Sequence, residues 1–373
     1  MTVTHTENAL EAIQGQTFVI PSFLALFGEM SSPLHGGYAC LRRSIDELIP
    51  RFFPNEKSGK QAQKIQRSDF ALLGCLWWPN VDLDALRLLT HLALWYLVWD
   101  DEMESKYLGV EGDLTAADKF RSQTRTVIAM SLGLADEDRA IIEGAPHLIQ
   151  QFYPLGGRIR SQISQGNLVL LLEMVDNILD DSKKEQHFVV TRNIPSIEQY
   201  WDYRTGTNLM EALYPVTSLA ISYELTVEEM RNPLLREYWE QINKTIALIN
   251  DILSFKKEIV RQSDHIAISV LTSQEQEKKE TLNLVFLKYL ELGCLQSAID
   301  STVGMLINSV GEMRRLKSKV LLGTEPHVHR LIETWDLYAV GFLHWSLITI
   351  RYGLDTFLQE DGTFIVSLSE TFD

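Results

Sequence analysis

The stretch that most constrains this chain is an apolar segment that begins at Leu83. Apolar residues fall on nearly every face of an expected helix of about 18 residues, and the run Leu92–Trp99 carries no charged side chain. A helix that is apolar all round has to be surrounded by other helices. Asp82 and Asp84 are both suited to cap its start. The segment therefore predicts a central helix in an α-helical bundle.

An acidic cluster, Asp100-Asp101-Glu102-Met103-Glu104, follows this apolar run directly. Carboxylates at the edge of a buried segment are costly to desolvate unless a cation or hydrogen bonds compensate them. Two interpretations stay open at this point. Either a core helix emerges into water here, or the protein holds a metal ion, with Asp100 and Glu104 four residues apart on one helix face.

The remaining chain has helical patterns and almost no strand signals, which predicts one all-α domain over residues 21–373. Residues 1–20 are expected to form a loose N-terminal tail, and Pro154 with Gly156-Gly157 is expected to break the chain. The main helices are expected at 38–53, 115–134, 158–179, 238–261, 295–320 and 327–351.

Composition narrows the function classes. The chain has 373 residues, of which 45% are hydrophobic, so it is expected to be globular. Its formal net charge of −16 argues against nucleic-acid binding, which needs a basic face. An anionic substrate would need metal ions or local Arg and Lys to screen this charge. Its three cysteines form no zinc or disulfide pattern, which indicates a reducing, cytoplasmic location. The apolar tract 337–350 contains His344 and Gly341 and is expected to be a core helix, not a membrane span.

A second set of oxygen-bearing side chains lies in the segment 238–261. Asn250, Ser254 and Glu258 are spaced four apart, so one helix face presents an amide, a hydroxyl and a carboxylate over two turns. These hard oxygen donors suit Mg²⁺ or Mn²⁺ and not zinc. A solvated polar stripe is the alternative. It is weakened by the apolar neighbours on this segment and by the poor fit of serine to a helix interior.

Two basic residues are placed to meet an anion. Lys257 follows this face and could reach an anion held by a metal, and Arg351 ends the last apolar segment with a guanidinium suited to bidentate binding of diphosphate. Taken alone, Arg351 is better explained as a surface residue at a helix end. On residue type alone, the tryptophans of the chain are better explained as core residues.

Taken as an ordered set, these motifs resemble those of class I terpene cyclases, and more narrowly of fungal sesquiterpene synthases. The resemblance covers about residues 65–355 and rests on Asp100-Asp101-x-x-Glu104, Asn250-Asp251-x-x-Ser254-x-x-Lys257-Glu258 and Arg351-Tyr352. It implies an all-α fold, a single class I terpenoid-synthase helical bundle with a central active-site cavity.

The resemblance also implies a reaction. A Mg²⁺-dependent enzyme of this kind ionises farnesyl diphosphate, cyclises the carbocation to a sesquiterpene hydrocarbon or alcohol, and releases diphosphate. Three Mg²⁺ ions are expected, for which Mn²⁺ can substitute. The implied metal ligands are Asp100, Glu104, Asn250, Ser254 and Glu258, and the implied diphosphate-binding residues are Arg204, Lys257, Arg351 and Tyr352.

Roles for other residues follow from the same resemblance. Asp101 is expected to pair with Arg351 when the site closes, whereas Glu104 departs from the more usual aspartate. Trp345 stands where the family often has a cavity tryptophan. Phe70 and Trp77 are further candidates to face the carbocation, for which core packing is the alternative; Trp95 and Trp335 share that alternative.

Several alternatives stay open. The substrate could be geranyl or geranylgeranyl diphosphate, or the protein could bind a prenyl diphosphate without turning it over. A chain-elongation enzyme would have a second aspartate-rich motif, and a protonation-initiated cyclase would have D-x-D-D, from which Asp82-Leu83-Asp84-Ala85 is one acid short. The expected partner is a small prenyl diphosphate, with no nucleic acid and no integral membrane association, in a monomer or homodimer.

Overall fold

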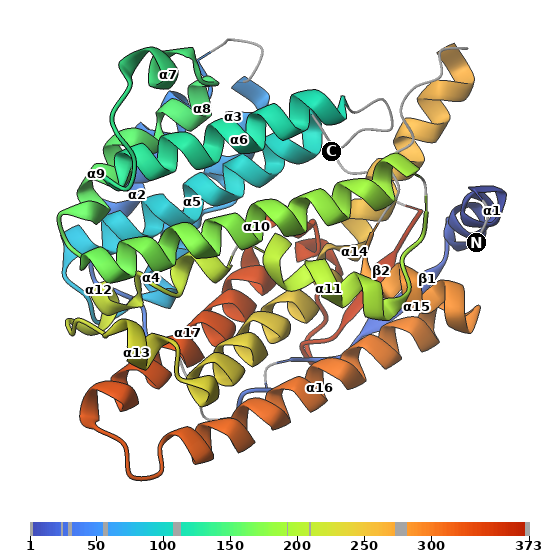
Figure 1. Ribbon diagram of the computed structural model, residues 1–373. Coiled ribbons are helices and arrows are strands. Elements are labelled where there is room, and N and C mark those ends of the chain that lie inside the picture. The colour runs from blue at the N-terminus through green and yellow to red at the C-terminus, as the bar shows by residue number, and fades with distance from the viewer. Residues whose placement is uncertain are drawn as a thin grey trace.

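The computed structural model describes residues 3–23, 25–28, 32–54, 59–106, 113–191, 193–208, 210–272 and 282–369. These residues are helical almost throughout, which confirms the all-α prediction (Figure 1). In chain order the elements are α1 (Val3–Ile13), β1 (Thr17–Ile20), α2 (Tyr38–Phe52), α3 (Gly59–Arg67), α4 (Phe70–Trp77), α5 (Leu83–Lys106), α6 (Leu114–Ser131), α7 (Arg139–Gly144), α8 (His147–Gln150), α9 (Phe152–Arg160), α10 (Gln165–Thr191), α11 (Ile197–Thr207), η2 (Met210–Leu213), α12 (Thr217–Ile221), α13 (Val227–Met230), α14 (Pro233–Thr272), α15 (Leu284–Leu292), α16 (Leu295–Val320), α17 (Pro326–Ile348), η3 (Ile350–Tyr352), η4 (Asp355–Phe357) and β2 (Phe364–Ser367).

Helix α5 is the buried helix that the sequence predicts. It packs against α2, α4, α9 and α12. Asp82 caps its start, because its Oδ1 accepts hydrogen bonds of 2.9 Å from the backbone nitrogens of Asp84 and Ala85. Trp95 and Trp99 are buried and donate their indole N–H groups to Leu148 O and Thr124 Oγ1. The helix runs through Lys106 and so carries the acidic cluster in its last turns.

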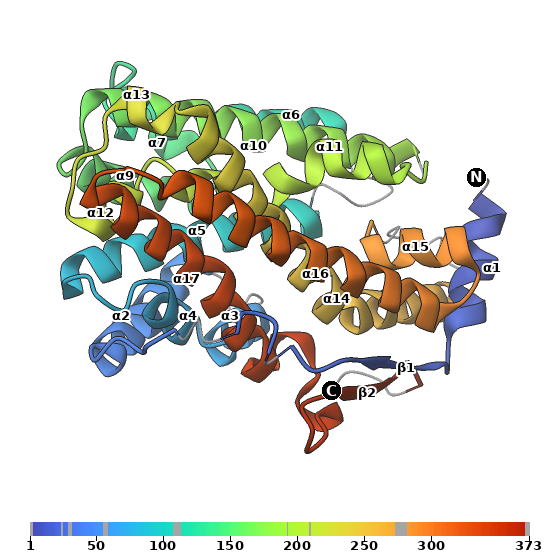
Figure 2. The ribbon, with the colours of Figure 1, turned by 90° about the horizontal axis from the view of Figure 1, so that it is seen from below.

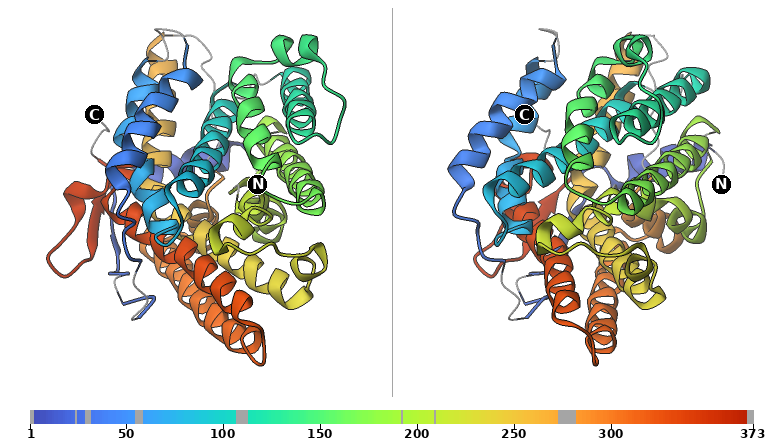
Figure 3. Two further views of the ribbon diagram at one scale, coloured as in Figure 1. Left: turned by 90° about the vertical axis from the view of Figure 1, so that its left-hand side faces the viewer. Right: turned by 60° about the vertical axis from the view of Figure 1, so that its left-hand side comes forward.

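Helix α14 is the second axis of the bundle, and it packs against α11, α15, α16 and α17. It extends beyond the predicted segment 238–261 at both ends, and Pro233 begins it at a position where no backbone N–H is needed. Asn232 caps this start by accepting a hydrogen bond of 2.9 Å from Leu234 N. A short turn joins α16 and α17 at one end of the molecule, coloured orange to red in Figures 1 and 3.

Close packing joins α17 to α4. A Cβ atom added to Gly341 would lie 3.0 Å from Cδ1 of Trp77 and 3.1 Å from Cβ of Leu76. The Trp77 indole donates to Tyr338 O at 2.9 Å. The tract 337–350 is therefore helical and largely buried as far as Leu347, as predicted, whereas Ile348 and Ile350 at its end are exposed. Among the residues that the structure describes, no helix has the length and apolar character needed to cross a membrane.

The first twenty residues differ from the loose tail that the sequence predicts. They contain α1 and β1, and β1 pairs antiparallel with β2 from Thr17↔Ser367 to Ile20↔Phe364 (Figure 2). Phe18 is buried and contacts Phe255 of α14 edge-on at 5.7 Å. On the open edge of β1, both backbone groups of Val19 bond the Gln296 side chain. A four-residue strand whose partner lies so far along the chain leaves no local pattern to read.

Two further local predictions were wrong. Pro154 and Gly156-Gly157 do not break the chain but lie inside α9, because a proline in the first turn of a helix loses no intrahelical hydrogen bond. The last long helix does not reach Arg351. Helix α17 ends at Ile348, Thr349 is extended, and Arg351 and Tyr352 lie on the separate turn η3.

Candidate active site

The turn η3 joins the two oxygen-rich motifs. Thr349 fixes its start: its Oγ1 donates to Ser68 O at 2.9 Å and accepts from Arg351 N at 3.2 Å. Gly353 ends the turn with a φ of +60°, which a residue with a side chain rarely adopts. Arg351 and Tyr352 are thereby held in neighbouring positions that contact different helices.

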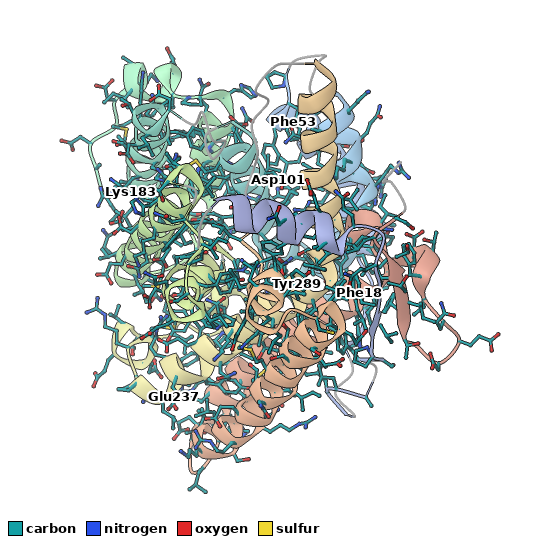
Figure 4. The ribbon with its side chains drawn as sticks, turned by 90° about the vertical axis from the view of Figure 1, so that its right-hand side faces the viewer. Phe18, Phe53, Asp101, Lys183, Glu237 and Tyr289 are labelled. Carbon is teal, nitrogen blue, oxygen red and sulfur yellow. The ribbon has the colours of Figure 1, made fainter. Side chains whose placement is uncertain are left out.

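Arg351 reaches the acidic end of α5. Its Nη2 lies 3.2 Å from Oδ1 of Asp101, and the two side chains are 14% and 25% exposed. Arg351 thus contacts Asp101, the residue predicted to pair with it. Figure 4 views the molecule from the side that carries Asp101, together with Phe18 of β1 and Tyr289 of α15.

Tyr352 reaches α14. Its ring is buried, and its hydroxyl accepts a hydrogen bond of 3.0 Å from Nδ2 of Asn250. Burial raises the pKa of Tyr352, so the phenol stays protonated. Nζ of Lys257 lies 5.5 Å from the centre of the same ring. Through this tyrosine, the Arg351-Tyr352 pair connects the α5 acids to the Asn250 face.

Arg204 of α11 contacts the other side of Asn250. Its Nη2 donates to Oδ1 of Asn250 at 2.9 Å and to Oδ1 of Asp251 at 2.8 Å. Burial lowers the pKa of Arg204, but the Asp251 carboxylate outweighs this and holds that pKa well above its ordinary value. Arg204, Asn250, Arg351 and Tyr352 are therefore four predicted residues joined in one contact chain.

Asp251 is the buried centre of this chain, with a side chain only 2% exposed. Its Oδ2 accepts hydrogen bonds from the Tyr200 hydroxyl and, at 3.1 Å, from Leu284 N. Burial and the charge of Asp251 raise the pKa of Tyr200 well above its usual range, so this hydroxyl remains a donor. A buried carboxylate is stable only with such a complete set of partners.

Ser254 and Glu258 continue the predicted metal-binding face. Ser254 Oγ is buried and forms no hydrogen bond within the described part of the chain, while Oε2 of Glu258 accepts from Asn283 Nδ2 at 2.9 Å. A buried hydroxyl without a partner costs about 1–3 kcal/mol, and a metal ion bound at this face would offset that cost. Amide, hydroxyl and carboxylate oxygens on one face fit Mg²⁺ or Mn²⁺.

Of the two metal ligands predicted on α5, the structure describes the side chain of only one. Asp100 is half-buried in the last turns of the helix, and the Glu104 side chain lies outside the described residues. Within the described residues, no three His, Cys, Asp or Glu side chains gather as a metal site by themselves. The candidate metal ligands include, besides carboxylates, the amide of Asn250 and the hydroxyl of Ser254.

Two of the predicted aromatic residues stand beside these groups. Phe70 lies 5.2 Å from Trp345 and 5.9 Å from the guanidinium carbon of Arg351, measured to ring centres. Trp345 contacts Tyr352 edge-on at 6.1 Å. Trp77 is held instead in the α4–α17 packing by its bond to Tyr338 O. Trp95 and Trp335 are fully buried among other aromatic rings.

A hollow of about 610 Å³ lies between α10, α11 and α14, and none of the predicted site residues is among those that line it. Its lining is strongly polar, with acids such as Asp181 and Glu240 and bases such as Lys184 and Lys244. It is separate from the contact chain described above.

Three residues of the contact chain were not among the predicted site residues. Tyr200 lies four residues before Arg204 on the same helix face, a spacing that could have shown it. Asp251 belongs to the quoted motif but received no role. Asn283 follows Glu258 at a distance that gives no periodic signal.

Comparisons with known proteins identify the family of this chain. Residues 91–312 match the family model described as terpene synthase family 2, C-terminal metal binding. The sesquiterpene cyclase hepA of Aspergillus oryzae is 22% identical over 371 residues, covering 96% of this chain and 95% of that protein. The terpene cyclase braA of Annulohypoxylon truncatum is 21% identical over 372 residues, covering 96% and 92%.

Solved structures show the same fold. An a-eudesmol synthase aligns with a TM-score of 0.68 at 16% identity, covering 86% of this chain and 97% of that one. The germacradien-4-ol synthase of Streptomyces citricolor aligns with a TM-score of 0.66 at 15% identity, covering 85% and 96%. The helical bundle is thus the class I terpenoid-synthase fold, and with the family model spanning more than half of its length, this chain is a terpene cyclase that belongs to terpene synthase family 2.

Proposed function

We propose that this protein is a Mg²⁺-dependent cyclase of farnesyl diphosphate that forms a sesquiterpene hydrocarbon or alcohol. The observation that carries the proposal is the position of Asn250, which contacts Arg204 on one side and Tyr352 on the other. An oxygen ligand for metal and two hydrogen-bond donors for diphosphate therefore converge on one point. The sesquiterpene cyclases among its relatives support the choice of a fifteen-carbon substrate.

The metal would be held by Asn250, Ser254 and Glu258 of α14 and by Asp100 of α5, with Glu104 as a further candidate. When bound, Mg²⁺ supplies Lewis-acid stabilisation of the charge that develops on the leaving diphosphate. Three ions are proposed, with Mn²⁺ as a substitute. Ser254 Oγ, which is buried and forms no hydrogen bond within the described residues, is an atom that such a ligand would satisfy.

The protein's own donors would bind the diphosphate. Arg204, Lys257, Arg351 and Tyr352 supply fixed N–H and O–H groups, which stabilise developing negative charge without reorganisation. The contact between Arg351 and Asp101 would help to keep water out, because it joins η3 to the end of α5.

Phe70 and Trp345 are proposed to face the carbocation. They lie together beside Arg351, and an aromatic face is worth about 0.5–2 kcal/mol to a nearby cation. The sequence also predicts this role for Trp77. Its indole N–H bond and close packing with Gly341 give it a structural role as well.

The direct test is to incubate the purified protein with Mg²⁺ and, separately, geranyl, farnesyl and geranylgeranyl diphosphate. Gas chromatography of the extract should show a cyclic product from farnesyl diphosphate, with none when EDTA replaces Mg²⁺. Product from another chain length alone would reassign the substrate. Intact substrate in every incubation would instead favour a protein that binds a prenyl diphosphate without turnover.

Asn250→Ala tests the metal assignment. Loss of one charge-stabilising group typically lowers kcat by about 100-fold or more, and here the apparent affinity for Mg²⁺ should fall as well. Asn232→Ala, at the exposed start of the same helix, is the matched control and should retain wild-type turnover. Unchanged turnover and unchanged Mg²⁺ dependence in Asn250→Ala would refute the assignment.

A further inference from the structure

Asn283, the residue before α15, joins that helix to the predicted metal-binding face of α14. It is 1% exposed. Its Oδ1 accepts a hydrogen bond of 2.8 Å from Val285 N and so caps α15. Its Nδ2 donates to the backbone oxygen of Asp251 and to Oε2 of Glu258, both at 2.9 Å. One buried amide therefore serves a helix cap and a carboxylate at the same time.

The start of α15 holds this part of α14 at a second point. Leu284 N donates to Oδ2 of Asp251 at 3.1 Å, next to the amide contact of Asn283. Asp251 is in turn bonded to Arg204 and Tyr200. Glu258 is thus tied through Asn283 to the same buried assembly that positions Asn250.

The contact with Glu258 is not needed for capping. A cap requires only the side-chain oxygen, and serine or aspartate supplies one equally well. The amide nitrogen adds a donor aimed at a long side chain, which would otherwise sample several rotamers. Fixing the carboxylate keeps one oxygen occupied and directs the side chain along the face shared with Asn250 and Ser254.

We propose that Asn283 is a positioning residue for Glu258, which it holds in place for a divalent metal. The inference rests on the proposed function, in which Glu258 is a metal ligand. Hydrogen-bond partners of metal ligands contribute to affinity because they fix the orientation of the ligand, and losing one typically weakens binding by about 10–100-fold.

The first experiment compares the full-length protein with Asn283→Ser. Serine keeps the cap but is too short to donate to Glu258. Binding of Mn²⁺ in the presence of inorganic diphosphate is measured from the loss of the free Mn²⁺ signal in electron paramagnetic resonance. The expected result is Mn²⁺ binding weaker by about 10–100-fold, with unchanged far-ultraviolet circular dichroism. Asn232→Ser, the same change at the start of α14, is the control and should bind as the wild type does.

A double-mutant cycle separates positioning from a general structural effect. In the Glu258→Gln background, Asn283→Ser should change Mn²⁺ binding by about 2-fold or less, because the ligand that it holds has already been altered. A full loss in both backgrounds would mean that Asn283 acts only through the fold, and it would overturn the inference.

A further variant covers the case in which Asn283→Ser does not fold. Asn283→Asp has nearly the same shape and caps α15, but its carboxylate cannot donate to Glu258, so the same loss of Mn²⁺ binding is expected. Wild-type Mn²⁺ binding in both variants overturns the positioning role alone. Failure of the wild-type protein to bind Mn²⁺ at all overturns the proposed metal site, and the inference with it.

Discussion

Arg204 donates a hydrogen bond of 2.9 Å from Nη2 to Oδ1 of Asn250, the oxygen proposed to bind metal. The same guanidinium contacts the buried Asp251 through two of its nitrogens. Arg204 therefore compensates the charge of Asp251 while it lies against a proposed metal ligand. Arg204 is therefore expected to contribute both to the stability of the fold and to the proposed activity, and the two contributions can be measured separately.

Arg204→Gln should destabilise the fold strongly, since removing one partner of a buried ion pair leaves an uncompensated charge and costs about 3–5 kcal/mol. The free energy of unfolding in urea measures the change. Arg125→Gln is the control, because Arg125 and Asp176 form an ion pair at 2.7 Å whose side chains are 50% and 37% exposed. Its loss should be about 1 kcal/mol or less. Equal losses in the two variants would contradict the buried role of Arg204.

Two neighbouring tyrosines of α11 allow a matched comparison. The Tyr200 hydroxyl is bonded to Asp251 and Arg204, whereas the buried Tyr203 hydroxyl has no hydrogen bond within the described residues. Tyr200→Phe should lower the free energy of unfolding by about 1–3 kcal/mol. Tyr203→Phe should leave it unchanged or raise it slightly. A larger loss in Tyr203→Phe would refute the assigned contacts.

The ion pair between Arg351 and Asp101 should matter more for turnover than for stability. Its side chains are partly exposed, so Arg351→Gln should change the free energy of unfolding by about 1 kcal/mol or less. Loss of a proposed diphosphate donor should lower kcat by about 100-fold or more. Urea unfolding and steady-state assays of one preparation check both values. A stable variant with wild-type kcat would remove Arg351 from the proposed site.

His91 on α5 should make stability depend on pH. Burial, with nearby Arg158, lowers the pKa of His91 from 6.5 to about 4, and its Nε2 lies 3.0 Å from Ser44 Oγ. Below pH 6.5, His91 binds a proton in the unfolded chain but stays neutral in the folded chain. The free energy of unfolding is therefore highest, as far as His91 determines it, above pH 6.5, and it decreases as pH falls toward 4. Across that window the loss is about 1–3 kcal/mol. His91→Gln should flatten the slope measured by urea unfolding, and an unaltered slope would contradict this cause.

Gly341→Ala should destabilise the contact between α17 and α4. Its Cβ would lie 3.0 Å from Trp77 and 3.2 Å from the backbone of Leu76, and overpacking of this kind costs about 1–3 kcal/mol. Gly311→Ala in α16 is the control, because its Cβ would meet nothing within 4 Å. There, the better helix propensity of alanine should stabilise the protein by up to about 1 kcal/mol. Thermal unfolding of the two variants should therefore shift in opposite directions.

Local pattern predicted most of the helical framework. Helix α16 has the predicted bounds, Leu295–Val320, and α5 lies among other helices with its apolar side chains largely buried. Predictions failed where an element pairs with a segment far along the chain, or where the effect of a residue depends on its position within a helix. The strand β1 depends on β2, and Pro154 is tolerated because of its place in the first turn of α9.

In the candidate site, too, helix spacing predicts some features and tertiary packing determines others. The spacing of Asn250, Ser254 and Glu258 placed one oxygen-bearing face correctly on α14, because a regular helix fixes which residues share a face. The contacts of Tyr352 with Asn250 and of Asn283 with Glu258 could not be read from spacing. They depend on where η3 and the start of α15 pack, which is decided by tertiary structure.

The pairing of β1 with β2 sets an order of events in biosynthesis. Ile20 pairs with Phe364, so β1 leaves the ribosome long before its partner exists. At about 5–20 residues per second, β1 waits on the order of tens of seconds with its backbone groups unpaired. Nearly the whole bundle is synthesised during this interval. The two strands can therefore pair only after nearly all of the helical bundle has left the ribosome.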